Sequence, residues 1–153
     1  MTKTSATVGL DEIRIAVVRQ LGDDPVVERQ AAPHPGPDRV LVRLRAAALN
    51  FADLLKARGE YQERQEPPFV PGLEGAGEIL SAPPGSGFRP GDRVAVLAAG
   101  TMAQTIAVPS AACTAIPDAM TFEQAAGFQI AYGTSHLALA ARAHLKAGQM
   151  AGA

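Results

Sequence analysis

The sequence predicts a mostly β protein, a barrel or sandwich of short strands, that ends in two helices. Over the first 120 residues, short β-branched or alternating stretches are separated by turns rich in proline and glycine. Residues 121–145 contain no proline and are rich in Ala, Leu and Gln, which favours helix there. The chain has 153 residues, 47% hydrophobic and 19% charged, which is the composition of one globular domain with a real core.

The strands are expected in short, separate stretches. Residues 13–18 (IRIAVV) are mostly β-branched, and after the turn GDDP residues 26–29 can return as a partner strand. Residues 39–49 alternate well at their start: Val40, Val42 and Leu44 point one way and Leu41, Arg43 and Arg45 the other, so one apolar face of this strand is expected to pack on the core. Further strands, each bounded by proline or glycine turns, are expected at residues 73–80, 92–98 and 101–108.

A short helix is expected after the third strand. From Phe51 the apolar period becomes helical, with Phe51, Leu54, Leu55 and Arg58 on one face, and Gly59 ends the helix. Asn50 is a good N-cap, and Asp53 at the N3 position favours the positive end of the helix dipole. These two polar residues could also contact a ligand. Judged from the sequence around them alone, their role in starting the helix is favoured over ligand contact.

The last third of the chain is expected to contain two helices. Thr121 can cap the first, with Gln124 as its capping-box partner. The stretch Tyr132-Gly133-Thr134 is expected to mark a kink or a break between the two helices, and Gly148 follows the second. Apolar side chains of these helices, Leu137, Leu139 and Leu145, are expected to be exposed, and they could pair with a second copy in a homodimer.

Charge and composition exclude several classes of protein. The net charge is -1, with 14 basic and 15 acidic residues, so no basic surface for nucleic acid is expected. No apolar run approaches the ~20 residues that cross a bilayer, and the N-terminus lacks a signal-peptide core, so a cytoplasmic protein without a membrane segment is expected. The single cysteine, Cys113, excludes an internal disulfide and a thiolate-rich zinc site, and it is expected to be a buried, inert thiol.

Two other patterns have plain structural interpretations. In GLEGAG (residues 72–77) the glycine spacing is the reverse of the G-x-G-x-x-G fingerprint, and the glycines begin a strand. Close backbone approach or a bulge is therefore expected, and not a phosphate loop. The histidines, His34, His136 and His144, are too dispersed to form a metal site.

Four motifs follow one another in order: VLVRLRAAALNFADLLKARGEY, PPFVPGLEGAGEI, FRPGDRVAVL and AIPDAMTFEQAAGF. Together they resemble the medium-chain dehydrogenase/reductase superfamily, in its zinc-free quinone oxidoreductase branch, which includes zeta-crystallin. The resemblance implies a GroES-like catalytic domain, a partly open β-barrel with short helices, over residues 11–120, after a flexible tail at residues 1–10. Residues 121–153 are then linker helices that lead toward a Rossmann domain.

The same resemblance implies an activity and a set of site residues. NADPH gives a hydride to a quinone or enone, and no zinc takes part, because Leu73 stands where the zinc enzymes have the histidine of their PGHE motif. Asn50 is expected beside the nicotinamide, with Asp53 and Tyr61 in the same substrate pocket, and Thr134 as a further cofactor contact. Asn50 is expected to cap the helix through its side-chain oxygen and so to leave its NH2 for a ligand. No general acid is identified.

The sequence ends in LKAGQMAGA, where relatives continue into the Rossmann domain. The 153-residue chain alone is therefore expected to bind NADPH weakly and to turn over negligibly. An alternative is a non-catalytic GroES-like module for interaction or oligomerisation. A weaker alternative is a zinc-type alcohol dehydrogenase.

Overall fold

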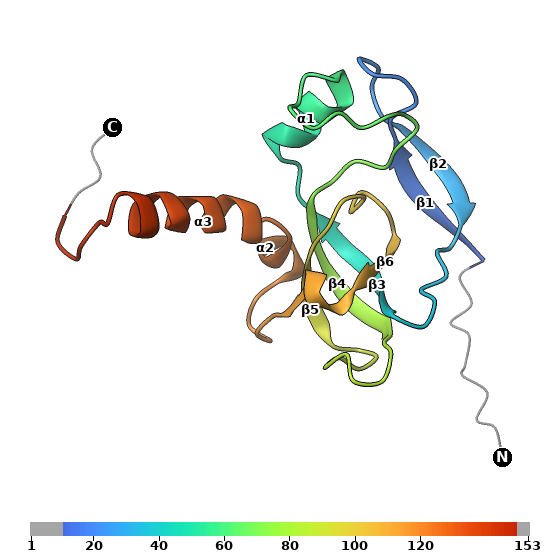
Figure 1. Cartoon of the computed structure of the whole chain (residues 1–153). Coiled ribbons are helices and arrows are strands. Elements are labelled where there is room, and N and C mark those ends of the chain that lie inside the picture. The colour runs from blue at the N-terminus through green and yellow to red at the C-terminus, as the bar shows by residue number, and fades with distance from the viewer. Residues whose placement is uncertain (1–10, 150–153) are drawn as a thin grey trace.

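The computed structural model describes residues 11–149, and the predicted tail at residues 1–10 lies outside them. Two antiparallel sheets form its body (Figure 1). The first is a hairpin of β1 (Glu12–Val17) and β2 (Val26–Ala31). The second has the order β6-β3-β4-β5-β7, with bounds β3 (Arg39–Ala47), β4 (Glu74–Ser81), β5 (Arg93–Leu97), β6 (Thr105–Pro109) and β7 (Cys113–Ala115). Every strand expected from the sequence is present, and the short β7 is additional.

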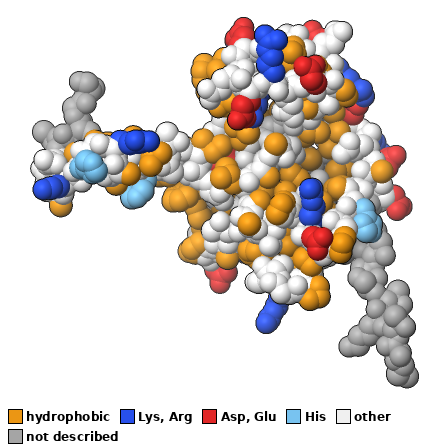
Figure 2. All heavy atoms as spheres, in the orientation of Figure 1, with side chains coloured by type: hydrophobic (Ala, Val, Ile, Leu, Met, Phe, Trp, Pro, Cys, Tyr) orange, Lys and Arg blue, Asp and Glu red, His pale blue; other side chains and the backbone are white. Residues whose placement is uncertain are grey.

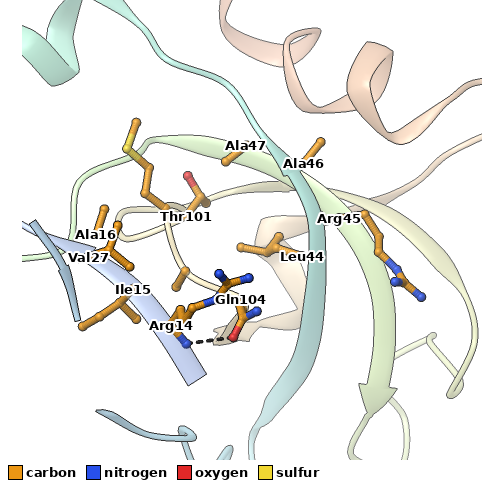
Figure 3. Close-up of a pocket in the computed structure, with 12 residues that line it drawn as sticks. Arg14, Ile15, Ala16, Val27, Leu44, Arg45, Ala46, Ala47, Thr101 and Gln104 are labelled. Atoms are coloured by element: carbon orange, nitrogen blue, oxygen red, sulfur yellow. Dashed lines mark hydrogen bonds between the residues drawn. The ribbon is translucent and has the colours of Figure 1, made fainter. Parts of the chain in front are cut away.

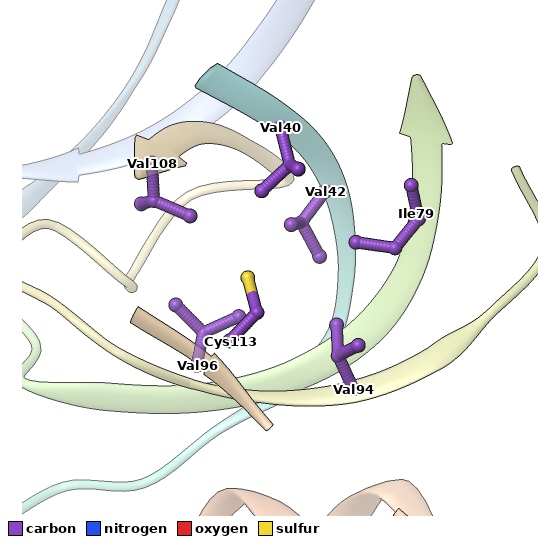
Figure 4. Close-up of a cluster of buried hydrophobic side chains, with 7 residues drawn as sticks. All are labelled: Val40, Val42, Ile79, Val94, Val96, Val108 and Cys113. Atoms are coloured by element: carbon purple, nitrogen blue, oxygen red, sulfur yellow. The ribbon is translucent and has the colours of Figure 1, made fainter. Parts of the chain in front are cut away.

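The core lies inside the curved five-stranded sheet, where side chains from all five strands converge (Figure 4). The alternation of β3 holds as predicted, because Val40 and Val42 are fully buried and Leu44 packs against the same cluster. The buried members of the cluster are Val40, Val42, Ile79, Val94, Val96, Val108 and Cys113. The β1–β2 hairpin has its own small cluster, and bridges from Ile15 to Ala103 and from Val18 to Phe69 attach it to the barrel.

The glycines of β4 allow two strands to approach closely. A Cβ on Gly77 would collide with the carbonyl oxygen of Arg43 on β3. The β3–β4 register shifts beside this contact, between Leu44 and Ala46. The interpretation of the glycine-rich stretch as a close backbone approach is therefore confirmed.

Helix α1 (Phe51–Arg58) begins at the predicted residue and ends at Gly59, which has a φ of 74°. Its buried face does not consist of its large apolar residues. Phe51 and Leu54 are 74% and 43% exposed, whereas Asp53 and Ala57 are buried. The reason is that the Asp53 carboxylate finds backbone donors inside the protein, and these hydrogen bonds turn that side of the helix inward.

The C-terminal segment consists of α2 (Phe122–Ala126), α3 (Gln129–His136) and a π-helical turn η2 (Leu137–Arg142). A single 3-10 turn, η1 (Ser110–Ala112), precedes β7. The capping box of α2 is confirmed, since Thr121 Oγ1 accepts from the Gln124 N–H at 3.2 Å and Gln124 Oε1 accepts from the Thr121 N–H at 3.0 Å.

The predicted break at residues 132–134 is wrong. The chain breaks at Gly127 and Phe128, and α3 runs through Gly133 because this glycine has an ordinary helical φ and open space around it. The segment projects from the barrel as an arm (Figure 1), and apolar side chains cover much of it (Figure 2). Leu137, Leu139 and Leu145 are exposed, as predicted. Over residues 11–149, no helix is both long and apolar enough to cross a bilayer.

Candidate functional site

The turn from β3 into α1 is held by the Asp53 carboxylate. Asp53 Oδ2 accepts a hydrogen bond from the Asn50 N–H at 2.8 Å, and Asp53 Oδ1 accepts one from the Gly72 N–H at 3.1 Å. The Asp53 side chain is only 3% exposed. Both of its oxygens are thus used by the backbone, one within the helix start and one in the loop before β4. Asp53 clamps α1 onto that loop.

Asn50 is the N-cap of α1, but it does not cap in the predicted way. Its carboxamide makes no side-chain cap hydrogen bond, and the Asp53 N–H donates instead to the Asn50 main-chain carbonyl at 3.0 Å. The Asn50 Nδ2 group donates to Glu74 Oε1 at 3.1 Å. The expectation that the cap leaves the NH2 free is therefore wrong. One of its two N–H bonds is taken by Glu74.

Glu74 is the residue that sequence reasoning missed. It opens β4, in the middle of the larger sheet, and is 1% exposed. Its Oε1 accepts from Asn50 and its Oε2 accepts from the Ile130 N–H at 2.9 Å. No Lys, Arg or His of the described chain forms an ion pair with it. An acidic residue at the head of an apolar strand was the available signal, since a buried carboxylate needs dedicated donors.

The floor of the site is a packed pair of loops. Thr101 is fully buried and donates its hydroxyl hydrogen to the Glu74 main-chain carbonyl at 2.9 Å. Gly72 lies against this loop with a φ of 102°, and a Cβ there would come within 2.8 Å of the Met102 nitrogen. Only glycine fits this position, because both its backbone conformation and its surroundings exclude a side chain.

The other two predicted site residues lie further along the chain from this cluster. Tyr61 is half-buried in the loop after α1, and the Lys56 ammonium lies 5.2 Å from the centre of its ring. Thr134 is exposed on α3, one turn beyond Ile130. Within the described chain, no hydrogen bond joins Tyr61 or Thr134 to Asn50. The structure therefore unites Asn50 and Asp53 at one turn and leaves Tyr61 and Thr134 outside that network.

Two hollows flank the turn. The larger, about 340 Å³, lies between β1 and the β3–β6 side of the barrel (Figure 3). Leu44 and Thr101 face it, and the Arg14 N–H closes one edge by donating to Gln104 Oε1 at 2.8 Å. The smaller, about 110 Å³, lies beside α1 and is bordered by Leu49, Leu54 and Met102, among others. Asn50 lines neither hollow; it is partly buried, and its Nδ2 group is turned toward Glu74.

The metal-binding and thiol chemistry of the described residues is limited. Cys113 is 8% exposed, and burial raises the pKa of its thiol to about 11. It is a buried and unreactive thiol, as predicted. Between residues 11 and 149, no group of three or more His, Cys, Asp or Glu side chains is placed to hold a metal ion.

Comparison with known proteins places part of the chain in a known domain family. Residues 36–118 match the alcohol dehydrogenase GroES-like domain. The quinone oxidoreductase-like protein 2 homolog of Nematostella vectensis is 37% identical over 147 residues, which cover 92% of this chain and 40% of that protein. A probable oxidoreductase from Mycobacterium abscessus has a TM-score of 0.87 and 36% identity, over 90% of this chain and 46% of that one. The quinone oxidoreductase from Thermus thermophilus, solved also as its complex with NADPH, has a TM-score of 0.77 and 32% identity. The match covers 89% of this chain and 43% of that one.

The chain spans less than half the length of these relatives. What it shares with them is the barrel and the helices that follow it, and the family match alone covers more than half of the chain. The chain therefore belongs to the alcohol dehydrogenase GroES-like domain family, among the quinone oxidoreductase-like members of the medium-chain dehydrogenase/reductase superfamily.

Proposed function

We propose that this chain forms the catalytic GroES-like part of an NAD(P)H-dependent quinone or enone oxidoreductase, with NADPH as the hydride donor. The observation that carries the proposal is the partly buried Asn50 carboxamide, whose Nδ2 group donates a hydrogen bond to the buried Glu74 carboxylate at 3.1 Å. The names of the relatives, and the NADPH complex of the Thermus thermophilus enzyme, support the same reaction class.

The residues around Asn50 fit a nicotinamide ring. Leu49 and Phe51 flank it in sequence and are 66% and 74% exposed, so they offer apolar surface that a flat ring can cover. The Asn50 Oδ1 acceptor and its remaining N–H are complementary to a primary carboxamide, which presents the same two groups. The donor and acceptor set of the chain thus matches the cofactor proposed for it.

Bound NADPH supplies the hydride, and the residues of this chain bind the nicotinamide ring and orient it toward the acceptor. Hydride transfer requires the ring and the acceptor carbon to be held at a fixed separation and angle. A carboxamide anchored to the sheet through Glu74 provides one such fixed group, and the flanking apolar side chains exclude water from the face they cover. A quinone or enone is already activated for addition at its β-carbon and needs no metal ion to polarise it. This agrees with Leu73, which stands where the zinc enzymes have the histidine of their PGHE motif.

The test is NADPH consumption with a quinone or an enone by the protein that carries this chain, in the wild type and in Asn50→Ala. We expect kcat/KM to fall roughly tenfold or more, because a misplaced ring reacts slowly. Gln30→Ala, on the exposed face of β2, is the matched control and should leave kcat/KM unchanged. Unchanged kcat/KM in Asn50→Ala, or no NADPH oxidation with either acceptor class, would contradict the proposal.

A second candidate function, an oligomerisation module, is favoured by the arm. Phe128 and Tyr132 stack with their ring centres 4.8 Å apart, and both are largely exposed, as are Leu137, Leu139 and Leu145. If this function is correct, sedimentation of the purified chain should give a concentration-dependent dimer. Tyr132→Ser with Leu137→Ser should then shift it to the monomer.

A further inference from the structure

Glu74 is a buried carboxylate for which the described residues supply no cation. Removing a carboxylate from water costs several kcal/mol unless hydrogen bonds replace its hydration. Here the replacement comes from two donors on different elements, the Asn50 side chain at the start of α1 and the Ile130 N–H at the start of α3. Glu74 is therefore the point at which the barrel, α1 and α3 meet.

The chemistry of the carboxylate decides how Asn50 is oriented. Both Glu74 oxygens accept a hydrogen bond, and an ionised carboxylate has no proton to donate. The Asn50 carboxamide must then turn its NH2 toward Glu74, because the opposite orientation would set two acceptors against each other. Oδ1 is left as the acceptor that the side chain offers to a ligand.

We propose that Glu74 is a positioning residue: it fixes the Asn50 carboxamide so that Oδ1 accepts a hydrogen bond from the ligand, and it ties that orientation to the start of α3. This inference rests on the proposed function, because the ligand group is an N–H or O–H donor such as the carboxamide of a nicotinamide. The quinone or enone carbonyl, which is an acceptor, is not the partner of Oδ1.

The connection to α3 follows from the second oxygen of the same carboxylate. Ile130 lies in the first turn of α3, where backbone N–H groups have no partner within the helix. A carboxylate at this position also interacts favourably with the helix dipole. A displacement of α3 would remove one of the two hydrogen bonds that hold Glu74, and would loosen Asn50 with it.

Glu74→Gln tests the proposal with little change in volume. Glutamine keeps one acceptor and presents an NH2 in place of the other, so either the Ile130 contact is lost or the Asn50 carboxamide must turn over to keep its hydrogen bond. Two NMR measurements on the purified protein report these contacts without cofactor: the shifts of the Asn50 side-chain NH2 and the hydrogen exchange rate of the Ile130 amide. We expect the NH2 signals to move toward those of an exposed asparagine, or Ile130 exchange to accelerate by about tenfold, the factor that corresponds to one net hydrogen bond.

Glu78→Gln is the matched control. Glu78 lies on the same strand, but it is partly exposed and pairs with Arg45 at 2.9 Å. This variant should leave both NMR signals unchanged. If Glu74→Gln also leaves both unchanged, the proposal is wrong.

A double-mutant cycle separates positioning from a merely structural role. If Glu74 acts through Asn50, Glu74→Gln should lower kcat/KM for NADPH in the wild type and have little further effect in Asn50→Ala. Additive effects would overturn the positioning role. NMR changes without any NADPH-dependent activity would refute the proposed function and leave the orientation of Asn50 by Glu74 established.

A second variant covers the case in which Glu74→Gln fails to fold. Asn50→Asp keeps the helix start and sets a carboxylate against Glu74, so the pKa of one of the two carboxyl groups should be raised. An NMR titration in which the introduced carboxyl ionises like that of an exposed aspartate would overturn the proposal, and a raised pKa at this pair would support it.

Discussion

The Arg93 guanidinium lies 4.6 Å from the centre of the Phe122 ring, across the gap between the end of the barrel and the start of α2. The same guanidinium donates hydrogen bonds to the main-chain carbonyls of Pro117, Asp118 and Met120. One side chain on β5 thus holds the segment that leads into the C-terminal arm. Glu74 holds the arm one helix further on, through Ile130.

We expect Arg93→Ala to lower the free energy of unfolding by about 1–3 kcal/mol, since it removes a charge-assisted donor from three carbonyls and a ring contact. Urea denaturation measures the change. Arg89→Ala is the control, because Arg89 is exposed and its hydrogen bonds, both with Asp92, are made by its backbone. Equal stability of both variants would show that the Arg93 contacts contribute nothing.

Asp53→Ala should destabilise the protein by about 2–4 kcal/mol, because it leaves two N–H groups without their acceptor near a buried site. Chemical denaturation provides the number, and the exposed Asp24→Ala provides the baseline. A loss below about 0.5 kcal/mol is the level of an ordinary surface substitution. It would mean that water takes the place of the Asp53 carboxylate as acceptor for the two N–H groups.

Gly77→Ala and Gly133→Ala should have opposite effects. At position 77 the added Cβ meets the Arg43 carbonyl, so β3 and β4 must separate, and we expect a loss of roughly 2 kcal/mol or more. At position 133 the Cβ meets open space within α3, so alanine should improve helix stability by about 0.5–1 kcal/mol. Thermal unfolding of the two variants compares them directly, and a stable Gly77→Ala would contradict the close approach.

The Cys113 thiol makes stability depend on alkaline pH. Its pKa in the folded protein is raised to about 11, from 9.0, because burial disfavours the thiolate. The folded protein therefore keeps a proton that the unfolded chain has released, so this contribution is full below the unfolded pKa and is lost as pH rises through the folded one. We expect the free energy of unfolding to fall between pH 9 and about 11, and to fall less steeply in Cys113→Ala. Identical slopes would contradict the effect of burial.

The 153-residue chain by itself should bind NADPH only weakly, and fluorescence titration measures the affinity. The described residues contain no glycine-rich turn between a strand and a helix that could hold a pyrophosphate, since the glycines of residues 72–77 lie before and within β4. A micromolar Kd for the chain alone would contradict this prediction.

Local patterns predicted the strands, the start of α1 and the capping box of α2 because each depends on residues within a few positions of one another. Alternation along β3 places Val40 and Val42 inside whatever sheet forms around them. Local reasoning does not reach the buried face of α1. The helical spacing places Phe51 and Leu54 on one face, but both are exposed, and the burial of Asp53 depends on the Gly72 N–H, 19 positions away.

The sequence by itself determined the order of short strands, the glycines that let β3 and β4 touch, and the polar residue at which α1 begins. Only the tertiary structure decided how that residue is used. Asn50 and Ile130 are 24 and 56 positions from Glu74, and no local pattern relates them. A buried carboxylate takes whichever donors the fold brings to it, so the orientation of Asn50 is a property of the assembled barrel and not of its motif.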